Sequence, residues 1–226
     1  MIKGYVTSAY DVTDAYKGIL VSAQDATVRI EPSDDDRTRL VFLEKKRRPY
    51  EFFVQDGVLT VRSTKRRWYQ LLKVGVDRSE IGVYVPRSMP EGISVKANVG
   101  NVDVCSISCG GAVDIQINTG KVNLEAVCCK ELDSKGNSGS VSLNKCTAKD
   151  RIFIKRNTGK VQLNDCTAPE IFVKTNTGKV CGKLPTNMAF VARTNTGKIQ
   201  IPQPPIGEVI GGRCEIKTNT GNIKFE

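Results

Sequence analysis

The sequence predicts an all-β protein built mainly as a parallel β-solenoid, and three observations carry that prediction. First, the phrase Asn-Thr-Gly-Lys, or a degenerate form of it, returns about every twenty residues in the 226-residue chain. Second, apolar residues flank each copy at a spacing of two. Third, the interval is too short for the helix that usually connects parallel strands. A fixed period of this length indicates stacked repeats that bury their apolar faces against their neighbours.

The glycine of this phrase marks a tight corner in each repeat. Asparagine tolerates the left-handed backbone conformation and glycine adopts it readily, so the pair lets the chain turn sharply. The asparagines of stacked repeats would lie about 4.8 Å apart, a spacing at which their amides can bond in a ladder. The corner glycines are Gly100, Gly120, Gly139, Gly159, Gly178, Gly197 and Gly221. They predict about seven coils, each made of a strand, a turn and a strand.

The apolar positions lie seven and five residues before each glycine and two and four residues after it. Val113 and Ile115 form such a pair before Gly120. Alternation at a spacing of two on β-branched residues is typical of a half-buried strand. Ser134 and Gly182 replace apolar residues in this pattern, and we expect their coils to pack less well.

We divide the chain at residue 90. Residues 1–90 lack the glycine repeat but contain strand-like segments, including a hairpin signal at Asp56-Gly57. We interpret them as an irregular antiparallel β region that caps the first coil, because an open strand edge invites aggregation. Residues 91–226 form the solenoid, with a loop insertion at 202–212, where the last interval is the longest. Such a loop has the length to fold over an end or a face of the stack.

Segments from both parts together resemble a known family. They are the strand Thr27–Pro32, the hairpin Val54–Val61, the segment Ile81–Pro86 and the Asn-Thr-Gly repeats. This set resembles the bacterial "putative adhesin" β-strand-repeat family, a domain of unknown function, over nearly the whole chain. The resemblance implies a right-handed parallel β-helix and a bacterial cell-envelope setting, often with an anchor or regulator domain elsewhere. It implies no catalytic residue.

Cations recur at fixed registers. The chain holds 34 Lys and Arg against 24 Asp and Glu, a net charge of +10. Six coils carry a cation four residues before the glycine, and four carry a lysine just after it. The first set is Lys96, Lys135, Lys155, Lys174, Arg193 and Lys217, and the second is Lys121, Lys160, Lys179 and Lys198.

These cation rows have two interpretations. Neighbouring like charges repel by roughly 1 kcal/mol or less in water, so the rows are tolerable as a plain solvated surface. The alternative is a track for a linear polyanion, such as an anionic wall polymer, an acidic glycan or a nucleic-acid backbone. We expect no specific nucleic-acid recognition.

Two denser basic clusters lie in the first part of the chain, at Lys45–Arg48 and Lys65–Tyr69. The second contains Trp68 and Tyr69, which we treat as candidate interface residues. Basic residues beside aromatic rings are typical of contacts with an anionic membrane surface or with stacked bases. Solvated loops beside a hairpin have the same composition, so both interpretations stay open.

An apolar strip is predicted on the outer face, six residues before the glycine. Phe153, Phe172 and Val191 occupy this position in three successive repeats. A contiguous apolar strip on a surface indicates a covering segment or an interface. We expect the 202–212 loop or a second subunit to bury the two phenylalanine rings, so a homo-oligomer is a candidate assembly.

The residue types argue against an enzyme. The chain has no histidine, which removes Ser-His and Cys-His pairs and the commonest metal ligand. The acidic residues look scattered, so we predict no pair of carboxylates for acid and base catalysis. The scattered residues are Asp103, Asp114, Asp133 and Asp165. We predict no catalytic residue, no cofactor and no metal.

Eight cysteines show no paired spacing for zinc. Cys146 and Cys166 share a register in neighbouring coils, where a disulfide is geometrically open. The alternative is that buried thiols fill a narrow core. So many thiols suit a reducing compartment better than an oxidising one.

Location and activity remain expectations. No stretch approaches the apolar length of a membrane span, and the first residues lack a signal-peptide core. If complete as given, the chain is expected in the cytoplasm, whereas the resemblance places it at the cell envelope. We expect a non-enzymatic, adhesin-like binding or scaffold surface for a polyanion, a glycan or a membrane. The alternatives are a carbohydrate-active enzyme on a β-helix, and a self-assembling module joined through the apolar strip or the open strand Asn222–Glu226.

Overall fold

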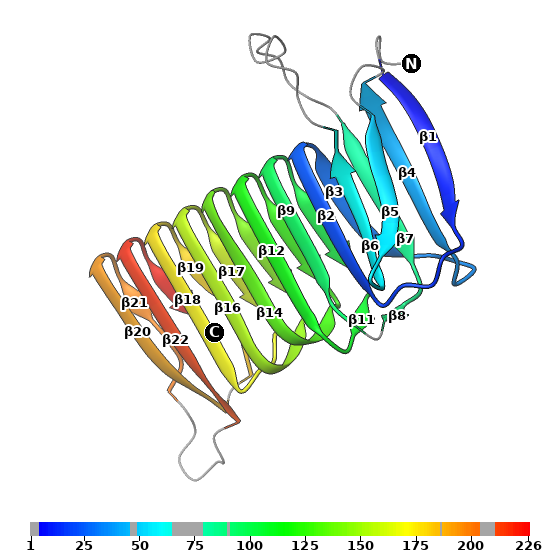
Figure 1. Cartoon of the computed structure of the whole chain (residues 1–226). Coiled ribbons are helices and arrows are strands. Elements are labelled where there is room, and N and C mark those ends of the chain that lie inside the picture. Colours follow the sequence, from blue (N-terminus) through cyan, green and yellow to red (C-terminus); the bar gives the residue numbers. More distant parts are fainter. Residues whose placement is uncertain (1–4, 46–48, 65–78, 90, 186, 204–210) are drawn as a thin grey trace.

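The computed structural model describes residues 5–45, 49–64, 79–89, 91–185, 187–203 and 211–226, and all regular structure in these ranges is β-strand. Figure 1 shows the strands stacked into one long pile, with β1 (Tyr5–Val12) at one end and β20 (Met188–Thr196) at the other. The described ranges contain no helix that could cross a bilayer. The predicted all-β class and long parallel sheets are therefore present.

Two sheets run along the stack, and each repeat gives one strand to each of them. The first sheet contains, in spatial order, β9 (Ile93–Val99), β12 (Ala112–Thr119), β14 (Cys128–Ser138), β16 (Thr147–Thr158) and β18 (Glu170–Thr177). The second contains β10 (Val102–Cys105), β13 (Val122–Glu125), β15 (Val141–Asn144), β17 (Val161–Asn164) and β19 (Val180–Lys183). Neighbouring strands in these runs are parallel, and each residue faces its copy in the next repeat apart from a bulge after Cys129. Short strands β8 (Ser88–Met89) and β11 (Ser108–Cys109) pair beside the first sheet.

The corner glycines lie one above another in the stack, where neighbouring backbones approach too closely to leave space for a side chain. All seven have positive φ angles, between 121° and 158°, which L side chains rarely adopt. A Cβ on Gly159 would lie 2.1 Å from the carbonyl oxygen of Gly139 in the neighbouring coil. On its other side, the N–H of Gly159 donates a 2.9 Å hydrogen bond to the carbonyl of Thr177. The file predicted from the repeat is therefore confirmed.

The asparagines before these corners form part of the predicted ladder. The amide of Asn118 donates to the side-chain oxygen of Asn98 at 3.2 Å, and that of Asn157 donates to Asn137 at 3.0 Å. A third bond joins Asn195 to Asn219. Each bond joins neighbouring coils, so these side chains reinforce the stack at its corner.

The last two coils are stacked in the reverse of their order in the chain. β22 (Gly212–Thr220) lies between β18 and β20, and β23 (Ile223–Phe225) lies between β19 and β21 (Ile199–Gln200). Figure 1 shows the red β22 between the yellow β18 and the orange β20. The prediction that every strand pairs with the next repeat is wrong here, and so is the open edge assigned to Asn222–Glu226. The longer interval at 202–212 supplies the chain length for this step.

A coil near the N-terminus is likewise stacked out of its order in the chain. β2 (Gly18–Asp25) and β3 (Thr27–Pro32) pair in parallel with β9 and β10, so they form a further coil of the stack. The corner of this coil is at Ala26, and a Cβ on Gly100 would lie 1.9 Å from the Ala26 carbonyl oxygen. Because this corner carries no glycine, the repeat pattern misses it, and the parallel stack includes strands that precede residue 90.

The strands beyond that coil are mixed. β6 (Val58–Ser63) and β7 (Glu80–Val85) continue the stack in parallel on β2 and β3. Antiparallel pairing joins β1 to β4 (Thr38–Lys45), β4 to β7, and β5 (Tyr50–Gln55) to β6. The predicted hairpin at Asp56-Gly57 is the connection between β5 and β6. The antiparallel cap therefore consists of fewer strands than the sequence suggested.

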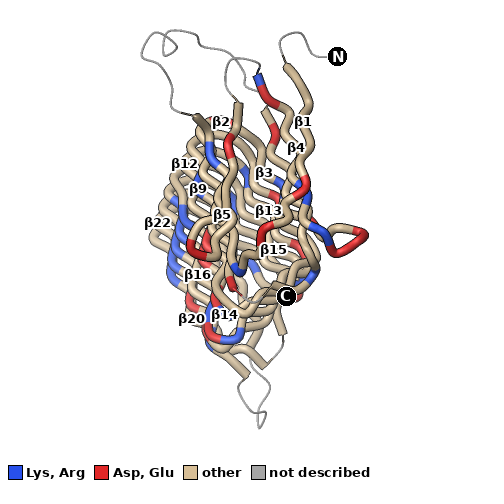
Figure 2. Tube along the Cα trace, turned by 45° about the vertical axis from the view of Figure 1, so that its right-hand side comes forward, with Lys and Arg blue, Asp and Glu red and all other residues tan. Residues whose placement is uncertain are grey.

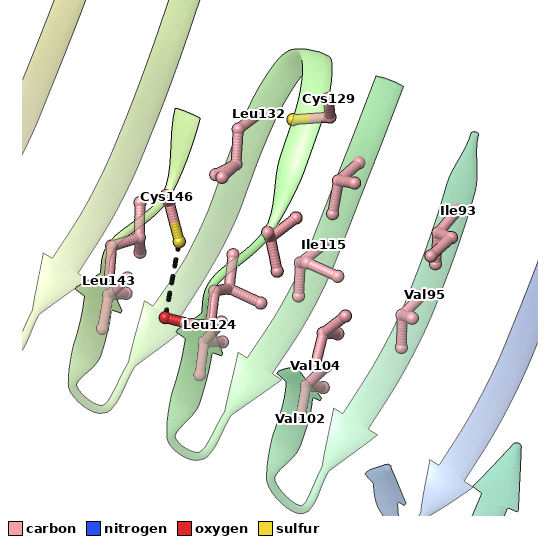
Figure 3. Packing of buried hydrophobic residues seen from close by; sticks show 14 of the residues in the cluster. Ile93, Val95, Val102, Val104, Ile115, Leu124, Cys129, Leu132, Leu143 and Cys146 are labelled. Carbon is pink, nitrogen blue, oxygen red and sulfur yellow. Dashed lines mark hydrogen bonds between the residues drawn. The ribbon is translucent and has the colours of Figure 1, made fainter. Parts of the chain in front are cut away.

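Buried side chains form a core between the two sheets. Figure 3 shows Val104 and Leu124 of the second sheet close to Ile115 and Leu132 of the first. The thiol of Cys146 lies among them and donates to the Leu124 carbonyl oxygen at 3.5 Å. All eight cysteines are free, and the buried ones are Cys109, Cys129, Cys146, Cys166 and Cys214. Thiols therefore fill the core, and Cys146 and Cys166 form no disulfide in this structure.

These buried thiols predict that the protein loses stability at alkaline pH. Burial raises the pKa of Cys129 and of Cys214 to about 12, whereas an unfolded thiol titrates near about 8.5. The folded state therefore holds these protons more tightly than the unfolded state does. The stability that the buried thiols contribute is complete below about pH 8.5 and is lost as pH rises toward about 12. We expect the stability advantage of the wild type over Cys214→Ala to shrink by about 2 kcal/mol between about pH 8 and pH 10. Urea unfolding of both proteins measures this, and an advantage that is independent of pH would contradict it.

Candidate functional site

The cations four residues before each corner glycine form one column on the outer face of the first sheet. Strand register places them in the order Lys96, Gln116, Lys135, Lys155, Lys174, Lys217 and Arg193. The reversed coil order inserts Lys217 between Lys174 and Arg193, so the last five members follow one another without interruption. Figure 2 shows blue Lys and Arg segments in succession across the strands near β22.

The members of this column differ in their partners. The ammonium of Lys135 lies 3.0 Å from a carboxylate oxygen of Asp133, and that of Lys217 lies 2.5 Å from one of Glu215. Four exposed members form no salt bridge to any residue that the structure describes, namely Lys96, Lys155, Lys174 and Arg193. The uncompensated charge is therefore greatest at the adjacent pair of Lys155 and Lys174.

A groove runs beside the column, along the axis of the stack. Its walls are the cation column and the corner asparagines, and its floor is the row of residues between them, three before each glycine. One section, of ≈ 700 Å³, crosses β14, β16, β18 and β22. A second, of ≈ 490 Å³, continues it across β2, β9, β12 and β14, and both sections include Lys135 and Gly136. The two sections together cross seven parallel strands. At about 4.8 Å per strand, this corresponds to about 29 Å along the stack.

The second predicted row, just after the corner, is less continuous. Ser140 separates Lys121 from Lys160, and Asn222 separates Lys179 from Lys198. Lys160 also donates to Gln162 at 2.7 Å. Because these lysines lie outside both groove sections, we give this row a smaller part in any binding surface.

The apolar strip is shorter than predicted. Phe153 and Phe172 stack with their ring centroids 5.3 Å apart and their planes within 7° of parallel. Glu215 lies between Phe172 and Val191, because its coil is inserted there. The prediction of a strip across three coils is therefore wrong.

Both phenylalanine rings are half-buried, and cations flank the stacked pair. The ammonium of Lys135 lies 5.5 Å from the Phe153 ring centroid, and that of Lys217 lies 5.6 Å from the Phe172 centroid. The covering of these rings by a loop or a second subunit stays a prediction, since residues 204–210 lie outside the described ranges. Trp68 and Tyr69, and the basic residues of their cluster, also lie outside them, as do Lys46 to Arg48.

Two carboxylates that the sequence analysis treated as scattered are neighbours. Asp114 and Asp133 face each other in β12 and β14. Gln116 donates to Asp114 at 2.7 Å, and Lys135 and Arg151 pair with Asp133. Neither carboxylate lines either groove section. Among the described residues, no group of three His, Cys, Asp or Glu side chains could hold a metal ion.

Arg156, which lies in the floor row, is not among the residues predicted from the sequence. It occupies an inward position that holds Ile117 and Gly136 in the two preceding coils, and its exposed fraction is 2%. The apolar alternation contained the signal, because an arginine three residues before Gly159 falls on the inner face of the strand. Its surroundings are described below.

Comparisons with known proteins find one family model and several solved structures similar to this chain. A family model described as Toastrack DUF4097 matches residues 16–226. A structure described as a "putative adhesin" from Bacteroides fragilis NCTC 9343 is 18% identical, with 99% of this chain and 98% of that chain covered and a TM-score of 0.46. A second "putative adhesin", from Parabacteroides distasonis ATCC 8503, is 14% identical, with 98% and 97% covered and a TM-score of 0.49. A "putative lipid binding protein" from the same organism is 12% identical, with 100% and 98% covered and a TM-score of 0.48. No curated protein matches.

Proposed function

This chain belongs to the Toastrack DUF4097 family, and we propose that it is a non-enzymatic binding protein whose working surface is the basic groove. The proposed ligand is a linear polyanion of the bacterial cell envelope, such as an anionic wall polymer or an acidic glycan. The proposal includes the adhesin-like role, the envelope setting and the right-handed winding in about seven coils. The observation that carries it is an uninterrupted run of five cations, of which Lys135, Lys155, Lys174 and Lys217 line a groove that crosses seven strands.

A comparison with a neighbouring row supports a binding role over plain solubility. Eight residues before four of the glycines, charges of opposite sign alternate across neighbouring strands. That row reads Glu131, Arg151, Glu170 and Arg213. Arg151 and Glu131 form a salt bridge of 2.9 Å. The stack therefore accommodates a charged surface with balanced signs, whereas the cation column keeps one sign at the same spacing.

The strands also fix the column before any ligand arrives. Lysines held on a rigid sheet present a row of point charges about 4.8 Å apart, which suits a chain of phosphate, sulfate or carboxylate groups. Because the backbone positions are already ordered, binding requires ordering only of the lysine side chains and the ligand. The groove beside the column gives the polymer a place to lie.

Removal of three of the four unpaired cations should weaken polyanion binding. We expect the triple variant Lys155→Ala, Lys174→Ala, Arg193→Ala to bind heparin or teichoic acid about 10- to 100-fold less tightly at low salt, at roughly 0.5–1 kcal/mol per lost ion pair. Wild-type affinity should fall as salt rises, with a shallower slope in the variant. Titration at several salt concentrations measures both quantities.

A matched control changes the same charge elsewhere. Lys17, Arg37 and Lys149 are exposed and lie outside both groove sections. The variant with these three residues replaced by alanine should bind nearly as tightly as wild type. Equal losses in the two variants, or no wild-type binding at low salt, would remove the groove as the working surface.

A further inference from the structure

We propose that the groove contains one fixed oxyanion site at β14, β16 and β18, where a single phosphate or sulfate group is held above a buried arginine, Arg156. This inference rests on the proposed function and deepens it, because it places one anchor point within a track of otherwise similar cations.

Arg156 carries a positive charge into the interior without a carboxylate partner among the described residues. Its exposed fraction is 2%. Its guanidinium donates to the Ser134 hydroxyl at 3.0 Å and to the Lys155 carbonyl oxygen at 3.4 Å, while its buried Nε has no partner in the ranges that the structure describes. Burial lowers the pKa of Arg156 to about 10. A buried charge without a counter-charge is unfavourable unless something else in the site balances it.

Two departures from the apolar repeat accommodate this guanidinium. Gly136 faces Arg156 across β14 and β16, and a Cβ on Gly136 would lie 2.3 Å from a terminal guanidinium nitrogen. Ser134, fully buried two residues earlier, accepts a hydrogen bond from it. The coil that we expected to pack poorly is therefore shaped around an arginine from the next coil. The guanidinium lies against the Gly136 backbone, and both residues line the larger groove section.

Further unpartnered polar atoms lie in the same row. Thr175 and Thr218 occupy the Arg156 register in the next two coils, and both line the same section. Their hydroxyl oxygens are buried and have no hydrogen-bond partner within the described part of the chain, like the Nε of Arg156. The three side chains are at least nine-tenths buried. Donors without partners therefore gather under the part of the groove where Lys155 and Lys174 are also unpaired.

An oxyanion in this section would meet complementary charge from two directions. The ammonium groups of Lys155 and Lys174 reach it from the wall, while Arg156 acts as a fixed positive charge beneath the floor. Charges interact more strongly through the protein interior than through water, because the interior screens them less. Arg156 is therefore a positioning residue, which selects where along the column the anion binds.

The test uses the full chain and small ions. Inorganic phosphate, sulfate and acetate are titrated into the wild-type protein at low ionic strength. Binding is measured by calorimetry and by the shift in the midpoint temperature of unfolding. We expect one site for phosphate or sulfate and a midpoint that rises with ion concentration, with little response to acetate. A preference for phosphate over sulfate, or the reverse, indicates which group the polymer carries. Absence of a site for either ion, or a stronger response to acetate, would overturn the inference.

The deciding variant is Arg156→Met, which keeps an unbranched side chain of similar length and removes the charge. Because methionine suits the apolar interior, the variant should stay folded and unfold in acetate at a temperature near that of wild type. Its phosphate affinity should fall about tenfold or more, the loss expected for a charged donor. Undiminished phosphate binding by the folded variant would disprove the role of Arg156.

A second variant covers the case in which Arg156→Met does not fold. Thr175→Val removes an unpartnered hydroxyl at constant shape, so it should be at least as stable as wild type in acetate and bind phosphate several-fold less tightly. Heparin titration separates this inference from the proposed function. If heparin binding depends on the lysine column but phosphate has no site, the inferred oxyanion site is wrong and the proposed function of the groove is still supported. If neither ligand binds, both fail.

Discussion

Replacing Ile223 with alanine is expected to lower the free energy of unfolding by about 2–5 kcal/mol, whereas the same replacement at Ile199 lowers it by less than about 1 kcal/mol. Both isoleucines lie two residues after a corner glycine, so they hold equivalent places in their coils. Ile223 is 1% exposed because its strand lies between β19 and β21. Ile199 is 44% exposed on the outermost coil. The first change leaves a cavity, and the second removes surface that is already partly solvated.

This pair of variants tests the reversed order of the last two coils. If the coils were stacked in chain order, Ile199 would lie inside and Ile223 at the end, so the ranking of the two losses would reverse. Urea unfolding of both variants, with the slopes compared to confirm similar native states, gives the two values. A larger loss at Ile199 than at Ile223 would show that the inserted coil is wrong.

The second large effect is expected at a stacked corner. Gly159→Ala should lower the free energy of unfolding by more than about 4 kcal/mol, or prevent folding. Its φ of 146° disfavours any side chain, and the new Cβ would lie 2.1 Å from the Gly139 carbonyl oxygen. Because both atoms belong to backbones fixed by hydrogen bonds to further coils, neither can move without shifting the stack.

Gly57 provides the control for that experiment. It also has a positive φ, 73°, but a Cβ there would meet nothing within 4 Å. Gly57→Ala should therefore lower stability by only the conformational term, about 1–2 kcal/mol. Thermal and urea unfolding of the two variants separate the contribution of coil contact from that of backbone conformation. Similar losses at Gly57 and Gly159 would mean that the corners do not touch as described.

Much of the fold follows from one-dimensional periodicity. The corner glycines, the inward apolar positions and the cation register could all be read from the sequence, because each depends on residues within one coil. The missed N-terminal coil shows the limit of that reasoning. Its corner at Ala26 makes the same close contact with Gly100 that glycine corners make with one another, yet it lacks the glycine that marks the repeat.

The candidate groove was predictable only in part. The sequence placed Lys155 and Lys174 in one column, since strand register follows from the repeat. It did not predict that the floor row contains a buried arginine, because an inward cation contradicts the apolar pattern unless Gly136 and Ser134 accommodate it. That accommodation comes from the neighbouring coil and is visible only when the two strands are placed side by side.

The sequence by itself determined what each coil presents to the core and to solvent, because strand periodicity fixes the direction of every side chain. The tertiary structure decided which coil lies next to which. Coils with the same corner and the same apolar spacing can pair with one another in almost any order, so local pattern cannot choose between them. The choice places Lys217 within the cation column and Glu215 beside Phe172. It depends on long-range strand pairing and on the length of the 202–212 connection.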